Sequence, residues 1–212
     1  MKKIKVIDSL YLSENGVYTK YKSNGKAHDF FIKQGDLDGA CAPYSVSMIL
    51  MLLGIIKRNE IGIRQLRDKR TRLGKLMSLF LDEKGLVLDG YDYKALHHEL
   101  QGIKNLVKTT YYKGDNEAFF EDLKQKVANN FPLLMSLEYS GGAHALVAVG
   151  YEYDLDGDIT KVLCLDPGFE KPLFTYWNSV IDVETVYTGK YKYKWLNSNS
   201  YVDIDDYICF ER

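Results

Sequence analysis

The 212-residue chain has few cysteines, few prolines and almost no net charge. It contains three cysteines and four prolines, and 28 Lys and Arg against 29 Asp and Glu give a formal charge of -1. An odd number of scattered cysteines does not make a disulfide framework, and their spacing fits no zinc site. The lack of a basic excess argues against a nucleic-acid partner, and an apolar fraction of 46% argues against disorder. We therefore expect a folded protein without nucleic acid, metal or cofactor.

Long hydrophobic runs are also missing. The longest one, residues 47–56, is far shorter than the roughly 20 residues that cross a bilayer. The N-terminus is basic, but Lys5 and Asp8 interrupt the apolar core that a secretory signal needs. We expect no membrane span and a cytoplasmic location for the chain as numbered, while secretion after removal of an earlier signal stays open.

Length and patterning indicate one domain, residues 1–212, with a change of pattern along the chain. Asn15-Gly16 and Asn24-Gly25 lie among alternating apolar and polar residues, and Asn-Gly favours two-residue hairpin turns. An order of helices followed by strands is typical of an α+β fold. The expected parts are an N-terminal β-meander (1–35), a mainly helical half (36–130) and a mainly β, antiparallel half (131–212).

Individual elements follow from the spacing of apolar residues. One helix is expected from about residue 43 to Gly54, and the segment 60–101 favours two or three short helices broken at Gly74, Gly85 and Gly90. A strand over 105–112 and an amphipathic helix over 115–129 should follow. The later strands are expected at 132–139, 145–153, 160–166 and 172–177.

Cys41 is a candidate nucleophile because it stands where a loop meets the first turn of the strongest predicted helix. Free backbone N–H groups and the helix dipole at that end favour the thiolate and lower the pKa of a thiol. A small buried residue is the commoner role of an isolated cysteine. Cys164 and Cys209 lie among apolar strand residues, so we expect both to be buried and unreactive.

His144 is the best placed of the four histidines to act as a base. Gly141 and Gly142 precede it and a strongly apolar strand follows, which indicates an imidazole at the end of a sheet. His28 falls in the predicted meander. The adjacent pair His97-His98 lies on a short predicted helix, where neighbouring side chains point in different directions.

Asp166 could orient His144. The strand that ends in Asp166-Pro167-Gly168 is joined to the preceding strand by an Asp156-Gly157 turn, which predicts a hairpin. Because His144 opens one strand and Asp166 closes the next, antiparallel pairing places both at the same edge of the sheet, as a base and its orienter require. Taken alone, this Asp-Pro-Gly sequence also fits an ordinary turn.

Together these segments resemble a known family. A glutamine, a short loop and a cysteine that opens a hydrophobic helix precede Gly-Gly-Ala-His-Ala-Leu-Val-Ala-Val-Gly-Tyr and Val-Leu-Cys-Leu-Asp-Pro-Gly. This order resembles the papain-like cysteine peptidases, above all the bacterial branch that includes the bacteriocin leader peptidases. The resemblance covers residues 34–54 and 141–177. Ala40 and Ala42 depart from the Asp and Gly usual in leader peptidases, and the loop between Gln34 and Cys41 is one residue longer than theirs.

The resemblance implies a papain-like α+β fold and a peptidase that hydrolyses a peptide bond. The implied roles are nucleophile for Cys41, general base for His144, orienter for Asp166 and oxyanion donor for Gln34. Asn178 competes with Asp166, because papain-like enzymes often use asparagine as orienter.

Cys41, His144 and Asp166 do not determine which molecule accepts the acyl group from the thioester. The same three groups also catalyse acyl transfer such as transglutamination, because hydrolysis and acyl transfer both pass through a thioester. A catalytically inactive binding module is the remaining alternative. A peptide or protein substrate is the expected partner, and an inhibitor or activator protein stays open.

Overall fold

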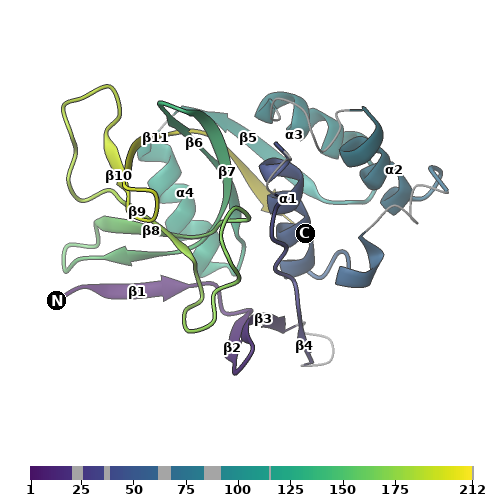
Figure 1. Cartoon of the computed structure of the whole chain (residues 1–212), viewed down its shortest axis with the longest axis horizontal. Coiled ribbons are helices and arrows are strands. Elements are labelled where there is room, and N and C mark those ends of the chain that lie inside the picture. The colour runs from purple at the N-terminus through teal and green to yellow at the C-terminus, as the bar shows by residue number, and fades with distance from the viewer. Residues whose placement is uncertain (21–25, 36–38, 62–67, 84–91, 115, 212) are drawn as a thin grey trace.

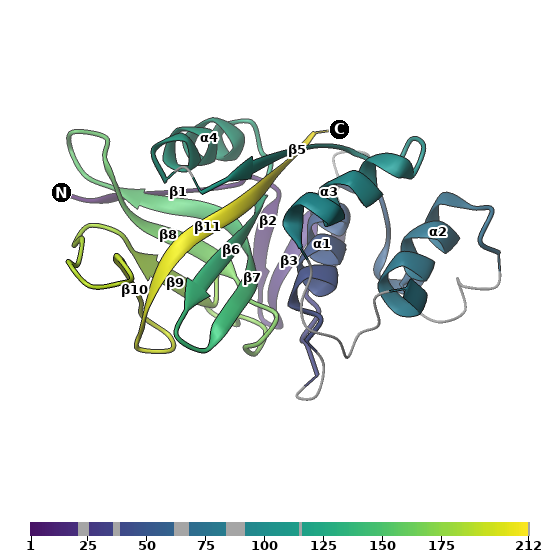
Figure 2. The same ribbon diagram turned by 90° about the horizontal axis from the view of Figure 1, so that it is seen from above.

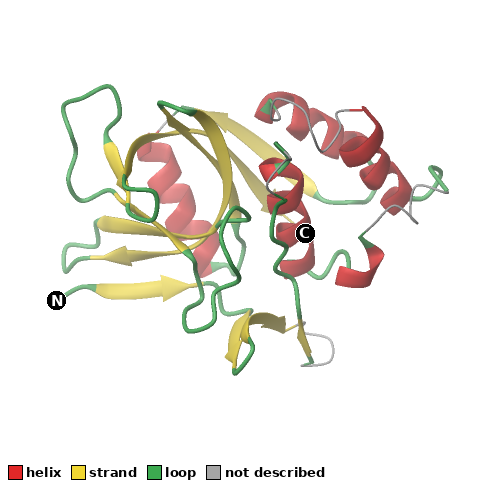
Figure 3. Ribbon diagram, viewed as in Figure 1, coloured by secondary structure: helices red, strands yellow, loops and turns green. Residues whose placement is uncertain are grey.

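The structure, a computed structural model, describes the whole chain except residues 21–25, 36–38, 62–67, 84–91, 115 and 212. Figure 3 shows strands gathered on one side and most helices on the other. The helices are α1 (Cys41–Leu52), the short 3-10 helix η1 (Arg58–Glu60), α2 (Arg72–Ser78), the π-helical turn η3 (Leu79–Glu83), α3 (Tyr93–Gly102) and α4 (Asn116–Ala128). The strands are β1 (Lys3–Val6), β2 (Leu10–Ser13), β3 (Gly16–Lys20), β4 (Ala27–His28), β5 (Lys108–Lys113), β6 (Leu133–Tyr139), β7 (Gly142–Tyr153), β8 (Ile159–Leu165), β9 (Ser179–Asp182), β10 (Tyr193–Trp195) and β11 (Ser200–Glu211). This mixture of helices and antiparallel sheets is compatible with the predicted α+β papain-like fold.

Six strands of the larger sheet form a closed circuit of antiparallel pairs. Strand β7 pairs with β6 and also with β8. The circuit runs from β6 through β11, β10 and β9 back to β8. Strand β1 adds to the C-terminal end of β7, and β5 adds to the C-terminal end of β11. Strand β7 is therefore held by hydrogen-bonded neighbours along its length.

Helix α1 lies between the sheet and the helices α2 and α3 (Figure 2). Every residue from 42 to 52 except Tyr44 is buried, and a helix that is apolar on nearly all sides is stable only inside a protein. Gly54 has a φ of 68°, which a glycine adopts without strain, and it follows the end of the helix as predicted. The opposite end of α1 starts at Cys41.

Helix α4 covers the sheet rather than joining the other helices (Figures 1 and 2). Its side chains Phe119, Leu123 and Val127 are fully buried, as the predicted amphipathic pattern requires, and α4 packs on β7 and β11. Helix α4 and strand β5, both from the predicted helical part of the chain, thus belong to the sheet side of the molecule. Nowhere in the described ranges is there a helix long and apolar enough to cross a membrane.

The predicted N-terminal meander is partly wrong. The hairpin at Asn15-Gly16 exists, since β2 and β3 are antiparallel and Ser13 pairs with Gly16. Strand β1, however, joins the larger sheet, with Val6 opposite Gly150 of β7. Within the described residues, the small sheet therefore consists of β2, β3 and β4. The predicted turn at Asn24-Gly25 lies outside the described residues.

The strand predicted over residues 172–177 is also wrong. Leu173 and Phe174 are exposed, and Pro172 has no N–H to donate to a ladder, so this segment does not form a strand. Strand β9 begins instead at Ser179, opposite Cys164 of β8. The predicted helix break at Gly74 falls inside α2, while Gly85 and Gly90 lie outside the described residues.

Candidate active site

Cys41 is the first residue of α1, and its side chain is half-buried beside β7. The N–H of Ala145 in β7 donates a hydrogen bond to Sγ at 3.4 Å. None of the described side chains caps this end of the helix, so the N–H groups of the first turn are directed toward the region around the thiol. The position combines a helix N-terminus with a strand that supplies a further N–H group.

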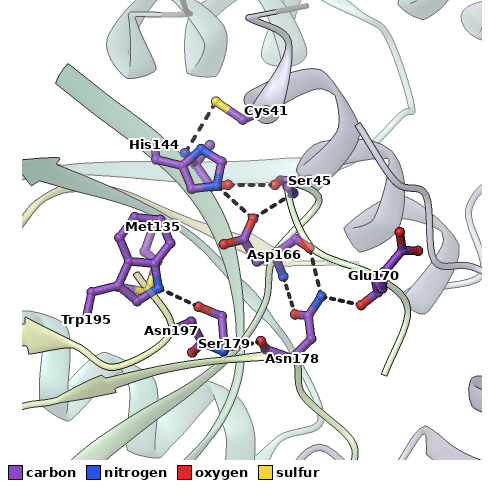
Figure 4. Close-up of polar contacts among 12 residues, drawn as sticks. Cys41, Ser45, Met135, His144, Asp166, Glu170, Asn178, Ser179, Trp195 and Asn197 are labelled. Atoms are coloured by element: carbon purple, nitrogen blue, oxygen red, sulfur yellow. Dashed lines mark hydrogen bonds and ion pairs between the residues drawn. The ribbon is translucent and has the colours of Figure 1, made fainter. Parts of the chain in front are cut away.

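His144 is the third residue of β7, where it lies opposite Leu137 of β6. Its Nε2 lies 2.7 Å from Oδ1 of Asp166. The imidazole also bonds to Cys41 on its opposite side (Figure 4). Because Nε2 is taken by Asp166, the nitrogen that faces the thiol is Nδ1. One imidazole thus connects a thiol and a carboxylate.

Asp166 directly follows β8 and is fully buried. The β7–β8 hairpin predicted from Asp156-Gly157 brings it to His144, since Leu165 pairs with Val147. Its Oδ1 accepts hydrogen bonds from His144 and from the N–H of Gly168, both at 2.7 Å. The carboxylate is thereby held at the end of the sheet.

The electrostatics of this group favour a thiolate and an imidazolium. Burial by itself lowers the pKa of His144, but hydrogen bonds to Asp166 and Cys41 and their negative charges raise it from 6.5 to about 10. Burial raises the pKa of the Cys41 thiol, yet the bond and charge of His144 and the N–H groups of Ala145 and Ala42 bring it below its ordinary value of 9.0. A thiolate is the form of cysteine that attacks carbonyl carbon.

Gln34 lines the same cleft as Cys41 and His144, a cavity of about 410 Å³. Its main-chain N–H donates to the carbonyl of Pro167 at 2.7 Å, which joins the chain before α1 to the turn that carries Asp166. The remaining lining residues are Gly39, Ala42, Asp92, Tyr93, Ser136, Ala143 and Ala145. The walls beside the thiol are therefore built largely from small side chains.

Sequence analysis missed Trp195 of β10. Its indole stacks on the imidazole of His144 with the ring centres 5.6 Å apart and the planes at 21°, and its Nε1 donates to Oγ of Ser179 at 2.8 Å. Phe169 meets the indole edge-on. The alternating pattern of Tyr193–Trp195 could have indicated a strand, but no local signal places that strand beside His144.

The side chain of Asn178 contacts the main chain beside the candidate site and not the imidazole of His144. Its side-chain amide bonds to the main chain of Asp166, at both the N–H and the carbonyl, and to the carbonyl of Glu170. Figure 4 shows this amide beneath Asp166, away from the imidazole. The carboxylate of Asp166 therefore lies between Asn178 and His144.

The other candidate thiols and imidazoles lie elsewhere. Cys164 and Cys209 are buried, and burial raises the pKa of Cys164 well above its ordinary value and that of Cys209 to about 12. The Nδ1 of His97 lies 2.8 Å from Oγ1 of Thr109 on β5. Over the described part of the chain, no group of three or more His, Cys, Asp or Glu residues is arranged to hold a metal ion.

A second, larger cavity of about 830 Å³ lies at the opposite end of α1. It is lined by residues from the end of that helix, from η1 and from the turn after α4, among them Ile55, Arg58 and Phe131. None of the four predicted site residues belongs to it. The smaller cavity is the one that Gln34, Cys41 and His144 line.

Comparison with known proteins identifies a family for most of the chain. A family model described as "Peptidase_C39 like family" matches residues 28–201, well over half of the chain, and the matched range includes Gln34, Cys41, His144 and Asp166. A search of curated proteins finds no match.

Proposed function

The chain belongs to the Peptidase_C39-like family, a papain-like cysteine peptidase family resembling the bacteriocin leader peptidases, and on this premise we propose that it cleaves a peptide bond with Cys41 as nucleophile. The observation that carries the proposal is the connection from Cys41 through His144 to Asp166, with Nε2 and Oδ1 2.7 Å apart. A nucleophile, a base in contact with it and a group that orients the base are the parts that thiol acyl chemistry needs.

In the first half of the reaction the Cys41 thiolate attacks the carbonyl carbon of the substrate. The negative charge that develops on the carbonyl oxygen needs preorganised donors. The N–H of Cys41 at the start of α1 and the side-chain amide of Gln34 are the proposed donors. His144 then gives its proton to the leaving amine, which departs and leaves a thioester on Cys41.

In the second half His144, now neutral, removes a proton from water as the water attacks the thioester. The tetrahedral intermediate collapses, the carboxylic acid leaves and Cys41 returns to the thiolate. Asp166 keeps Nε2 of the imidazole occupied throughout, so that Nδ1 stays directed at the reacting atoms. The buried stack of His144 on Trp195 further limits rotation of the ring.

A digest of an unbiased peptide library, followed by mass spectrometry, tests the proposal. We expect new termini with the wild type, no cleavage with Cys41→Ala and normal cleavage with the matched control Cys164→Ala. In H₂¹⁸O the new carboxyl group should carry ¹⁸O, because water resolves the thioester. Products formed by transfer to an amine without ¹⁸O would identify an acyltransferase instead, and cleavage by Cys41→Ala would overturn the assignment of the nucleophile.

A further inference from the structure

Asn178 makes an unusual set of bonds to the main chain of one residue of the candidate site. Its Oδ1 accepts from the N–H of Asp166 at 2.7 Å, and its Nδ2 donates to the carbonyl of the same residue at 2.9 Å. A second bond from Nδ2 reaches the carbonyl of Glu170 at 3.0 Å. One amide group therefore holds both ends of the turn that leads away from Asp166.

These bonds continue the pairing of β8 with β9 beyond the last paired residues. The ladder ends where Cys164 pairs with Ser179, and the N–H of Asn178 donates to the carbonyl of Cys164 at 3.1 Å. The next residues of β8 would lack partners in β9, because the chain turns away through Glu170 and Pro172. The side-chain amide of Asn178 occupies that place with one donor and one acceptor, as a backbone peptide would.

The main chain of Asp166 matters because its carboxylate has no freedom to compensate for a shift. The side chain is fully buried, and Oδ1 bonds at once to His144 and to the N–H of Gly168. A main-chain displacement of a few tenths of an ångström at Asp166 would pass directly to the bond with Nε2, which is only 2.7 Å long.

We propose that Asn178 is a positioning residue for the candidate triad, which acts by fixing the main chain of Asp166 so that its carboxylate stays on His144. The proposal rests on the proposed function only in taking Asp166 as the orienter of His144. Asn178 touches neither the imidazole nor the thiol, so its effect passes entirely through Asp166. Among the residues of similar size only asparagine supplies a donor and an acceptor in one plane, so alanine or serine cannot replace both bonds.

The contact between Asp166 and His144 can be tested without a peptide substrate. The test measures the rate at which iodoacetate alkylates Cys41 over a range of pH. The reagent is an anion, so it reacts fastest while Cys41 is a thiolate and His144 is an imidazolium. The rate should fall at low pH as the thiol becomes protonated, and should fall again near pH 10 as the imidazolium loses its proton. We call this fall near pH 10 the upper limb of the profile. Its position reports how far Asp166 raises the pKa of the imidazole of His144.

In Asn178→Ala we expect the upper limb to move down by about one pH unit, since loss of an opposite charge at short range shifts a pKa by about 1 to 3 units and the displaced carboxylate keeps part of its effect. Asn197→Ala is the matched control. Its Nδ2 donates to the carbonyl of Asn178 and its Oδ1 accepts from the N–H of Val180, both at 2.8 Å. This variant should lose thermal stability to a similar degree while its upper limb stays near pH 10.

A double substitution separates positioning from general loss of stability. Asp166→Ala keeps the main-chain groups that Asn178 binds but removes the carboxylate. Adding Asn178→Ala to it should lower the melting temperature further and leave the alkylation profile unchanged, because the residue through which Asn178 acts is gone.

Several outcomes would overturn the proposal: a wild-type profile in Asn178→Ala, the same shift in Asn197→Ala, or an additional shift in the double variant. If Asn178→Ala does not fold, Asn178→Ser carries the same test, since its hydroxyl satisfies one of the two groups of Asp166 and should give a smaller shift. A wild type whose Cys41 reacts no faster than Cys164 would instead contradict the proposed function itself.

Discussion

Three groups in contact with the imidazole of His144 act on its charge. Asp166 bonds to Nε2, Cys41 contacts the opposite side, and the face of Trp195 lies against the ring. An aromatic face attracts a cation, so the indole adds to the effect of the two negative groups. Since burial alone would lower the pKa of this imidazole, its raised value near 10 depends on these partners.

His144→Ala should therefore slow alkylation of Cys41 at pH 7 by about tenfold or more, because each unit of rise in thiol pKa lowers the thiolate fraction about tenfold below that pKa. Once the imidazolium is gone, burial is left to raise the pKa of the Cys41 thiol. Stopped-flow or gel-based labelling with iodoacetamide measures the rate. His97→Ala is the control, and a loss in that variant together with a normal rate in His144→Ala would show that His97, not His144, is the partner of the thiol.

Gln34→Ala should lower turnover by roughly a hundredfold, because removal of one oxyanion donor costs about 3 kcal/mol in other acyl-transfer enzymes. The bond between Gln34 and Pro167 is made by the main chain and survives the substitution. Steady-state kinetics on a peptide identified by the library digest gives the rate. The isosteric variant Gln34→Glu, which loses the donor but keeps the shape, should be equally slow.

Labelling of Cys41 provides the second readout for Gln34. The donor acts on the substrate oxygen and not on the thiol, so Gln34→Ala should be alkylated as fast as the wild type. Normal turnover in Gln34→Ala would direct the search for oxyanion donors to main-chain N–H groups.

At the scale of the element, the residues of the candidate site lie at the ends of one helix and two strands. Cys41 begins α1, His144 lies near the start of β7 and Asp166 follows the end of β8. Side chains at these ends reach the cleft without breaking the hydrogen bonds of the element that holds them. The elements that carry Cys41 and His144 are firmly held, since α1 is buried almost throughout and β7 is paired along its length.

The pairing of β1 with β7 depends on Gly150. A Cβ placed there would come within 2.4 Å of the carbonyl oxygen of Lys5 and 2.9 Å of Cα of Val6, so main-chain atoms would have to move. We expect Gly150→Ala to lower the free energy of unfolding by about 1 to 3 kcal/mol, the range of an overpacked site. Gly102→Ala at the end of α3 is the control, because nothing lies within 4 Å of its Cβ.

Urea denaturation followed by circular dichroism gives both values. Hydrogen exchange should also show that Ile4 and its neighbours in β1 lose protection in Gly150→Ala. An unchanged β1 with full stability would contradict its place in the larger sheet.

On the scale of the whole molecule, the closed circuit of strands and the buried helix α1 share one hydrophobic core. That core includes side chains from the sheet, such as Leu146 and Ile208, and from the helices, such as Met48 and Leu96, all of them fully buried. Such a core is expected to unfold as a unit. The two buried thiols lie in different strands of it, Cys164 in β8 and Cys209 in β11.

Cys164 and Cys209 should therefore react with iodoacetamide at a common rate that is set by unfolding. Measured by mass spectrometry in a Cys41→Ala background, both rates should rise together with urea. Native Cys41 should react without urea in the wild type, which serves as the reference. Fast labelling of Cys209 alone would reveal that β11 and β5 open separately from the rest.

The residues proposed for the candidate site could be selected from the sequence because they lie at sharp changes of pattern. Cys41 stands at the beginning of a continuous apolar helix, and an Asp-Gly turn at a hairpin fixes which end of β8 returns to His144. Helix propensity and strand alternation are signals that extend over only a few residues, and both signals are strong in the segments around Cys41, His144 and Asp166. The matched family model covers all the residues selected in this way.

The contacts that only the tertiary structure decided are those between segments far apart in the chain. Nothing near β1 indicates that it pairs with β7, and residues 172–177 have an apolar pattern although they form no strand and Leu173 and Phe174 are exposed. In the same way Trp195 reaches His144, and Asn178 reaches the main chain of Asp166, only because the strand circuit brings β8, β9 and β10 together. Sequence by itself thus determined which residues could carry the chemistry, whereas long-range strand pairing determined what surrounds and holds them, because pairing partners are selected by burial in the whole molecule and not by local preference.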